Sequence, residues 1–356
     1  NNFRWIINNF SNFCTMTISK VLLIYTGGTI GMIEDPIVKS LKPFNFNQIT
    51  NEIPELNKLN CQIDALAFQN PIDSSNINFE IWTQIGDDIF RNYDEYDGFV
   101  VLHGTDTMSY TASALSLMFQ NLSKPIILTG SQLPLGQVRT DGKENLITAI
   151  EIASMKRNKK AIIQEVAIYF ENQLFRGNRT TKVSADHFDA FKSYNYPTLA
   201  DVGVEINFNY SHLLRRGSKE LYYKNKFDPG VLVVFFYPGI VVKSVIEIIK
   251  NSSSKVIVLM SYGSGNLPSD KNLIQFIKSQ ANSKKIFLNV SQCIAGKVEQ
   301  EKYETGLNLK KAGVVGSLDM TLELVIVKSM FLLNKYPFDN LKFKENFVTN
   351  IAGELS

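Results

Sequence analysis

Two hydroxyl-rich loops carry residue types that suit chemistry at a carbonyl carbon. The first, Thr26–Gly31, holds two threonines around two glycines. Glycines let a backbone approach a ligand closely, so a threonine hydroxyl here can reach a carbonyl carbon while nearby N–H groups face the developing oxyanion. A plain strand-to-loop turn is one alternative. A phosphate-binding loop is another, although neither GKS/T nor GxGxxG follows this strand.

The second loop, Leu102–Met108, follows another apolar run and contains Thr105, Asp106 and Thr107. Each of these three residues alone could simply cap a helix, where unpaired N–H groups favour them. Three consecutive polar residues at the end of a strand, facing the same crevice as Thr26–Gly31, favour a site instead. Asp106 could bind a substrate ammonium group, and Thr105 could hold an attacking water.

A hydroxyl nucleophile needs a base to take its proton. His103 would complete a Thr–His–Asp arrangement, but the GxSxG elbow of such hydrolases is absent, which favours a structural role. A lysine with a lowered pKa is the other option, and Arg176–Lys182 supplies Lys182. By itself that segment also fits a basic surface turn.

Two further loops offer polar groups. The segment Ile72–Asn76 precedes a helix and would normally be interpreted as its cap, yet it also presents hydroxyl and backbone donors to a carboxylate. The loop Ser261–Asn266 follows a later strand, and Asn266 could reach a ligand in a neighbouring site. A simple turn is the alternative there.

The elements that must position these loops alternate between strand and helix. Short apolar runs predict buried parallel strands, and 3.6-residue periodicity with capping residues predicts helices. Asn78 is expected to cap a helix whose apolar face is Ile81, Ile85, Ile89 and Phe90. The predicted strands are Lys20–Thr26, Cys61–Phe68, Gly98–Leu102, Pro125–Thr129, Glu165–Phe170, Val231–Phe236, Lys255–Met260 and Lys285–Val290. The predicted helices are Phe46–Leu59, Thr107–Asn121, Asp141–Ser154, Val241–Asn251, Asp270–Ala281 and Leu322–Asn334.

Strands separated by helices predict two α/β domains with mostly parallel sheets, a larger N-terminal domain and a smaller Rossmann-like C-terminal domain. Ligands bind beyond the carboxyl ends of such strands, where the polar loops lie. The polar stretch ending in Asp-Pro-Gly is interpreted as a linker. The expected divisions are a tail at 1–16, a catalytic domain at 17–210, a linker at 211–229 and a second domain at 230–356.

Composition excludes several classes. The 356 residues are 44% hydrophobic and 20% charged, with a net charge of +3, which indicates a globular protein and no nucleic-acid partner. Three scattered cysteines and three histidines predict neither a disulfide framework nor a metal site, and fit a reducing, cytoplasmic location. No apolar run has the length of a membrane span. Met16 is interpreted as the start of the protein, so the preceding residues are expected to be a tail that is not native.

Together these loops resemble the bacterial L-asparaginase family, specifically its type I, cytosolic branch. The similarity runs from about Ile18 to near the C-terminus. Long motifs in the same order make it specific. They are Leu23–Gly31, Gly98–Met108, Pro125–Pro134, Arg176–Lys182 and Ser261–Asn266.

The resemblance implies a role for each loop. Thr29 would be the primary nucleophile, with Thr105, Lys182 and Asp106 as a second polar triad and Asp106 bound to the substrate's α-amino group. The α-carboxylate would be held by Ser74 and the backbone around Asp73 and Ser75. Asn266 would contribute across a subunit contact, since such enzymes are dimers or dimers of dimers.

Two departures from the family pattern stand out. Family members often carry a tyrosine on the loop after the TGGT segment that helps activate the nucleophile, and Met32–Phe46 contains none. Some type I members also bind asparagine as an effector beside an arginine. Thr181 and Cys293 match the neighbours of that arginine, but Met260 stands in its place. Methionine cannot bind a carboxylate as arginine does, so weak or absent effector binding is expected.

The implied reaction is hydrolysis of L-asparagine to L-aspartate and ammonia through a threonine acyl-enzyme, with backbone N–H groups near Gly104 and Thr105 stabilising the oxyanion. No metal or organic cofactor is expected. The rivals are a glutamine-preferring amidase, an amidotransferase subunit acting on aminoacyl-tRNA, and a non-catalytic amino-acid-binding protein. A binder would need Asp106 and Ser74 but not two activated threonines.

Overall fold

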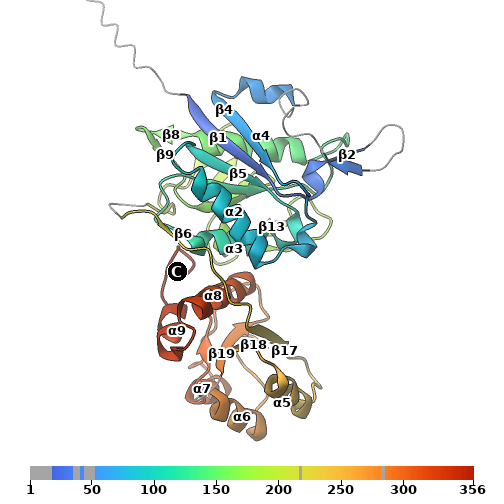
Figure 1. Cartoon of the computed structure of the whole chain (residues 1–356). Coiled ribbons are helices and arrows are strands. Elements are labelled where there is room, and N and C mark those ends of the chain that lie inside the picture. The colour runs from blue at the N-terminus through green and yellow to red at the C-terminus, as the bar shows by residue number, and fades with distance from the viewer. Residues whose placement is uncertain (1–17, 35–40, 44–52, 216–218, 282–284) are drawn as a thin grey trace, which may run out of the picture.

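The computed structural model describes residues 18–34, 41–43, 53–215, 219–281 and 285–356. Two α/β bodies lie one above the other and meet at a narrower junction (Figure 1). The expected tail at 1–16 and most of Met32–Phe46, the loop without a tyrosine, lie outside the described residues.

The upper body is built on a sheet of eight described strands. Neighbouring strands β4, β1, β5, β7 and β10 are parallel, and β10, β11, β14 and β15 continue the sheet in antiparallel fashion. In sheet order the bounds are β4 Cys61–Ala67, β1 Ser19–Tyr25, β5 Gly98–Leu102, β7 Ile126–Thr129, β10 Val166–Phe170, β11 Gln173–Arg176, β14 Ala200–Val202 and β15 Ile206–Phe208.

Side chains of the central strands alternate between two helical layers. Leu22 and Ile24 of β1 pack in the core beside α2 (Phe79–Arg91) and α3 (Met108–Met118). Val21 and Leu23 pack on the other face with α4 (Gly142–Ser154). Successive residues of a strand point to opposite faces, so burial on both faces explains the continuous apolar runs that identified these strands.

Helix α2 begins as expected, since the Asn78 side chain accepts a hydrogen bond from the Ile81 backbone N–H at 3.1 Å. Ile85 and Ile89 are fully buried. Phe90 was expected on the same face but is 46% exposed and stacks on Tyr223. That expectation was wrong because Phe90 packs on the chain that leads to the second body.

Two helix boundaries were also wrong. The described part of Phe46–Leu59 forms only a 3-10 helix, η3 (Pro54–Lys58), which begins at a proline. The helix expected over Thr107–Asn121 ends at Met118, where the chain becomes β6 (Phe119–Gln120) and pairs with β16 (Tyr222–Tyr223). Asn121 then takes a positive φ of 62°, which a helix does not allow.

The lower body contains a sheet of four described parallel strands. Its elements are β17 Val231–Phe235, α5 Val242–Asn251, β18 Val256–Ser261, α6 Lys271–Ala281, β19 Ile286–Ser291, α7 Glu304–Lys311, β20 Val315–Gly316, α8 Leu322–Lys335 and α9 Asn340–Phe347. The two-body, mostly parallel α/β class is therefore confirmed, although α7, β20 and α9 were not predicted.

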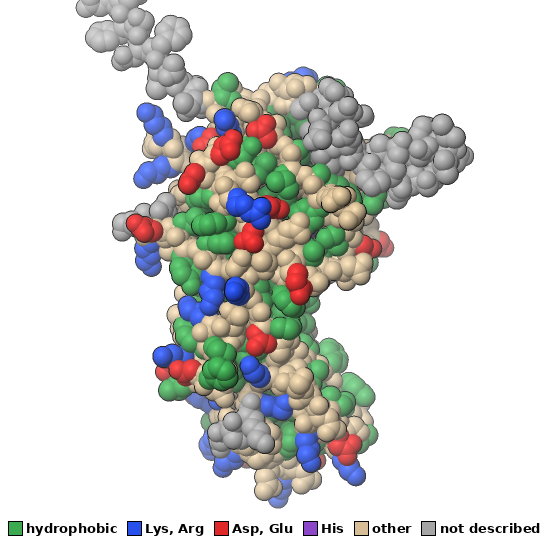
Figure 2. All heavy atoms as spheres, in the orientation of Figure 1, with side chains coloured by type: hydrophobic (Ala, Val, Ile, Leu, Met, Phe, Trp, Pro, Cys, Tyr) green, Lys and Arg blue, Asp and Glu red, His purple; other side chains and the backbone are tan. Residues whose placement is uncertain are grey.

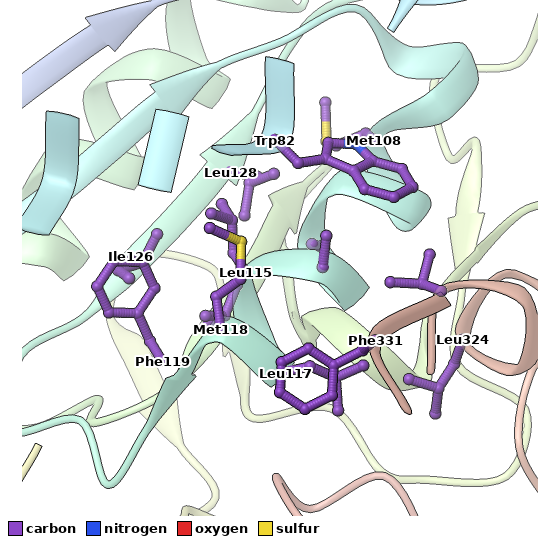
Figure 3. Close-up of a cluster of buried hydrophobic side chains, with 14 of the residues drawn as sticks. Trp82, Met108, Leu115, Leu117, Met118, Phe119, Ile126, Leu128, Leu324 and Phe331 are labelled. Atoms are coloured by element: carbon purple, nitrogen blue, oxygen red, sulfur yellow. The ribbon is translucent and has the colours of Figure 1, made fainter. Parts of the chain in front are cut away.

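The two bodies share a core where α8 packs against α3. Figure 3 shows Leu117 of α3 facing Phe331 and Leu324 of α8, and all three side chains are fully buried. Figure 2 shows acidic and basic side chains interspersed over this face of both bodies. The remaining short elements are β2 Met32–Glu34, β3 Leu41–Pro43, β8 Lys156–Arg157, β9 Lys160–Ala161, β12 Thr181–Lys182 and β13 Phe191–Lys192.

Candidate active site

Strand order brings three of the predicted loops together. Strand β1 lies between β4 and β5 and runs parallel to both, so the loops after these strands leave the same edge of the sheet. They are the loop Thr26–Gly31, the segment Ile72–Asn76 and the loop Leu102–Met108. This edge is where parallel α/β sheets bind ligands.

Glycines make the approach of these loops possible. A Cβ on Gly28, whose φ is +87°, would lie 2.5 Å from the Gly104 backbone nitrogen. A Cβ on Gly104 would lie 2.6 Å from the Ser74 Cβ and Oγ. Larger residues at either position would push the backbones apart. Since Gly28 and Gly104 directly precede Thr29 and Thr105, this contact holds the two threonines on adjoining loops.

The two threonines of the first loop differ in their surroundings. The Thr26 hydroxyl is buried and donates to the Leu102 carbonyl at 2.9 Å, which ties the end of β1 to β5. Thr29 opens the 3-10 helix η1 (Thr29–Gly31) and is half-buried. Within the described chain its hydroxyl makes no hydrogen bond. Thr26 therefore has a structural role, whereas the Thr29 hydroxyl can turn to a ligand.

Lys182 joins the second polar group from a distant part of the chain. Its Nζ donates to Thr105 Oγ1 at 2.8 Å and to Asp106 Oδ1 at 2.7 Å. The Lys182 side chain is 16% exposed and that of Asp106 is 66% exposed, so the carboxylate faces solvent beside a largely covered ammonium group. The structure thus brings together the three residues proposed as a triad.

His103 lies two residues before Thr105, and both of its ring nitrogens are occupied by partners other than Thr29 and Thr105. Its ring is fully buried, with Nδ1 at 2.7 Å from the Gly104 carbonyl oxygen and Nε2 at 2.8 Å from Thr111 Oγ1. Burial lowers its pKa to about 4, although the bond to the Gly104 carbonyl opposes the shift. The ring is neutral at physiological pH and holds the loop backbone, which agrees with a structural role.

The segment Ile72–Asn76 is ordered by its own polar groups. Asp73 Oδ1 accepts from the backbone N–H and the hydroxyl of Ser75, both at 2.9 Å, which lowers the Asp73 pKa. Thr107 donates to the Ser74 carbonyl oxygen at 2.7 Å, so this segment is tied to the second loop. Ser74 itself is buried against Gly104.

Asn266 is not brought to this site within one chain. It lies beyond β18 in the lower body, where its Oδ1 accepts from the Thr305 hydroxyl at 2.6 Å. Its backbone pairs with Tyr262. In this conformation Asn266 stabilises a turn, which was the alternative interpretation.

Thr181, Met260 and Cys293 do meet, around a cavity of about 150 Å³. The Thr181 hydroxyl donates to Glu323, a carboxyl group whose pKa is raised by burial. Thr181, which lines this cavity, directly precedes Lys182 in the chain. The polar wall of the cavity is thus acidic, where an arginine would have made it basic.

Two polar residues of these sites were missed from the sequence. Gln132 accepts from Thr105 Oγ1 at 3.3 Å, and its backbone N–H donates to Asp141. It sits in a motif already singled out after β7, so its strand-end position was the available signal. Glu323 gave no signal, because the first turn of a helix is an ordinary place for an acidic residue.

The described residues offer neither a metal site nor a membrane-spanning helix. Within the ranges that the structure describes, no group of three or more His, Cys, Asp or Glu side chains is placed to hold a metal ion. None of the described helices has the length and apolarity needed to cross a membrane.

Comparisons with known proteins agree with this geometry. Residues 20–214 match the family model described as Asparaginase, N-terminal, and residues 230–347 match the Glutaminase/Asparaginase C-terminal domain. L-asparaginase 1 of Escherichia coli is 38% identical over 342 residues, covering 96% of this chain and 99% of that protein.

Solved structures give the same result. L-asparaginase I from Vibrio cholerae superposes with a TM-score of 0.85 at 35% identity, covering 96% of this chain and all of that one. The thermostable L-asparaginase from Thermococcus kodakarensis has a TM-score of 0.85 at 32% identity, with 95% and 99% coverage. The chain belongs to the asparaginase family and is a hydrolase that acts on linear amides.

Proposed function

We propose that this protein hydrolyses L-asparagine to L-aspartate and ammonia through an acyl-enzyme on Thr29. The observation that carries the proposal is that Lys182 Nζ donates hydrogen bonds to both Thr105 and Asp106. The close approach of Gly28 to Gly104 supports it, because it brings the loop of Thr29 against the loop of Thr105. A pure binding site would need the carboxylate, but it would not need a lysine hydrogen-bonded to a threonine hydroxyl.

The proposed steps divide between the two threonines. Thr29 Oγ1 attacks the side-chain amide carbon, and the proton that its hydroxyl loses passes to the leaving nitrogen, so the C–N bond breaks and ammonia leaves. Water held by Thr105 then attacks the ester, while Lys182 assists proton transfer. Backbone N–H groups near Gly104 and Thr105 stabilise the oxyanion, and loss of one such donor typically costs about 2.7–4 kcal/mol of barrier.

The ends of the substrate would be held by the loops around the threonines. The solvent-facing carboxylate of Asp106 suits the α-ammonium group. Ser74, with the backbone of Asp73 and Ser75, would bind the α-carboxylate. Asn266 would act from a second copy of the chain, in a dimer or tetramer. We further propose a cytoplasmic location, in keeping with the scattered cysteines.

The cavity lined by Thr181, Met260 and Cys293 is proposed to bind asparagine weakly or not at all. An amino-acid carboxylate entering it would meet Glu323 and no arginine side chain on the cavity wall. Asparagine saturation is therefore expected to be hyperbolic. A cooperative curve that disappears on changing Thr181 or Cys293 would contradict this.

One assay tests the proposed function. Ammonia release is measured over a concentration series of L-asparagine and L-glutamine for the wild type, Thr29→Ala and Thr26→Val. Thr29→Ala should remain folded and lose roughly four to six orders of magnitude in kcat, as the loss of a nucleophile does in other hydrolases. Thr26→Val removes a buried hydrogen bond, so it should lose about 1 kcal/mol of stability and keep its activity within tenfold.

The same assay separates the rivals. Preference for glutamine would favour the related amidase. The two substrates must be compared directly, because they differ by one methylene, which is worth only about 1–3 kcal/mol in a pocket. Calorimetric binding of asparagine without ammonia release would favour a non-catalytic binder. Substantial activity in Thr29→Ala would exclude Thr29 as the nucleophile.

A further inference from the structure

The strand that carries Lys182 is not part of the eight-stranded sheet. This strand, β12, has two residues, and among the described strands it pairs with β13 alone, in a separate two-stranded sheet. Strand pairing alone therefore fixes Lys182 weakly, although its Nζ must stay within hydrogen-bond distance of Thr105. The turn before it, η6 (Gly177–Arg179), is fully buried.

That turn binds a segment from the far end of the sequence. Asn178 Nδ2 donates to the Ala352 carbonyl at 2.9 Å, Arg176 Nη1 donates to the Gly353 carbonyl at 3.0 Å, and Arg179 Nη1 donates to the Glu354 carbonyl. Two side chains of the turn and Arg176, the last residue of β11, thus hold three consecutive carbonyl groups. Figure 1 marks the C-terminal end of the chain at the junction of the two bodies. We call residues 352–354 the buttress segment.

The buttress segment is itself shaped by a buried carboxylate. Glu354 is fully buried, and its Oε1 accepts from Lys328 Nζ of α8 at 2.6 Å. Its Oε2 accepts from the backbone N–H of Ala352 at 2.6 Å and of Ile351 at 3.0 Å. The carboxylate therefore folds the segment back on itself and anchors it to α8 of the lower body.

Arg179 also joins the two bodies directly. Its Nη2 contacts Asp319 Oδ2 at 2.8 Å, just before α8, and the Asn195 carbonyl at 2.7 Å. Burial acts to raise the Asp319 pKa, but the hydrogen bonds from Arg179 and Ser356 outweigh it, so the pKa lies below its ordinary value. The guanidinium thus fixes the turn against the buttress segment and the lower body together.

We infer that Arg179 and the buttress segment are a positioning device for Lys182, holding its Nζ at Thr105. The inference rests on the proposed role of Lys182. Loosening the buttress segment should let β12 shift away from the second loop. Because a misplacement of about 1 Å can cost about a hundredfold in rate, kcat should fall while KM, set by the other loops, changes little.

Gly353 offers a mild way to displace the segment. Its φ is +80°, and an added Cβ would lie 2.8 Å from Arg176 Nη1. That guanidinium cannot easily retreat, since it also binds Glu165 and the His212 carbonyl. Gly239 is a matched control, because its φ is +92° and an added Cβ meets nothing within 4 Å. Both substitutions strain the backbone, but only Gly353→Ala places a methyl group against the Arg176 guanidinium.

The test is a double-mutant cycle on the full-length protein, in which the four forms are wild type, Gly353→Ala, Lys182→Met and the double variant. Gly353→Ala should lower kcat about ten- to a hundredfold with KM within about twofold. It should have less than about a twofold effect when Lys182 is already methionine. Gly239→Ala should retain wild-type kcat. An equal loss in both backgrounds, or none in either, would overturn the inference.

Amide hydrogen exchange gives a second readout that does not depend on activity. Gly353→Ala and Arg179→Lys should speed exchange at residues 180–183, while strands β5 and β7 stay protected. If Lys182→Met keeps wild-type activity, the proposed role of Lys182 fails, and exchange alone then decides whether the buttress segment positions β12. Unchanged exchange at residues 180–183 would reject the positioning device.

Discussion

The loops after β5 and β18 begin alike and end differently. Each leaves the carboxyl end of a buried parallel strand and contains glycine and hydroxyl residues. In the lower body, the polar groups satisfy one another. The Ser261 hydroxyl donates to Asn289 at 2.5 Å, Asn289 Nδ2 donates to the Gly265 carbonyl at 2.8 Å, and Thr305 donates to Asn266.

In the upper body, the corresponding groups are connected to other loops. Thr105 and Asp106 take their hydrogen bonds from Lys182, more than 70 residues away, and Gly104 packs against Gly28 and Ser74. Strand-end position alone therefore does not make a site. What distinguishes the upper loop is close backbone approach on one side and a charged donor from a third segment on the other.

Among the changes that compare these two loops, the largest expected effect comes from removing that donor. Lys182→Met keeps the length of the side chain but loses the ammonium group, so kcat should fall by about a thousandfold or more, within the range of general acid–base catalysis. Steady-state ammonia release measures it. Lys271→Met, on α6 of the lower body, is the matched control and should leave kcat unchanged. Comparable activity in both variants would remove the distinction between the two loops.

Acid should affect the two loops differently. His103, directly after β5, has a pKa of about 4 against an ordinary value of 6.5. Between these two pH values the imidazole is protonated in the unfolded chain and neutral in the folded chain. His103 thus favours folding fully above pH 6.5, and about 3 kcal/mol should be lost as pH falls through 4. Asn289 of β19, which is buried and hydrogen-bonded to the lower loop, has no titrating group.

Trp82 reports on this loop, because its Nε1 donates to Thr111 Oγ1 at 3.1 Å and Thr111 contacts His103. Urea unfolding followed by Trp82 fluorescence, in a Trp5→Phe background, should show the loss between pH 6.5 and 4 for the wild type. His103→Gln should flatten that part of the stability profile. Parallel profiles for the two proteins would show that another group dominates acid sensitivity.

The smallest of these effects compares two glycines. Gly28→Ala places a Cβ 2.5 Å from the Gly104 nitrogen, so kcat should fall about a hundredfold as the loops separate. Gly263 in the lower loop also has a positive φ, of +50°, but its Cβ would meet nothing within 4 Å. Gly263→Ala should therefore keep kcat within about threefold, at a cost of about 1 kcal/mol in stability. Equal losses would show that backbone strain, and not loop contact, sets the rate.

Local patterns were sufficient for elements buried on both faces. Strand β5 was predicted with its observed bounds, because a short apolar run bounded by polar residues and glycine is typical of a strand buried on both faces. Local patterns were insufficient where a partner distant in the sequence decides whether a segment is helix or strand. Leu117, Met118 and Phe119 are all buried, and only the pairing of Phe119 with Tyr223 ends α3 and begins a strand.

The same limit applies to the site. Thr29, Thr105, Asp106 and Lys182 belong to recognisable motifs, and the structure joins the last three by hydrogen bonds. Gln132 contacts Thr105 only because the chain after β7 folds back over the second loop. The role expected of Asn266 needs a second copy of the chain, which no pattern within one sequence can position.

The buttress segment gives synthesis a part in activation. The carbonyl that Arg179 binds belongs to Glu354, which is 175 residues later in the sequence. At the usual ribosomal speed of about 5–20 residues per second, the turn before Lys182 waits about 10–35 s for that partner. The upper body can close its sheet during this interval, but the hydrogen bonds of Arg176, Asn178 and Arg179 to residues 352–354 form only afterwards. If the proposed positioning role holds, we expect the growing chain to reach full kcat only after residues 352–354 have docked.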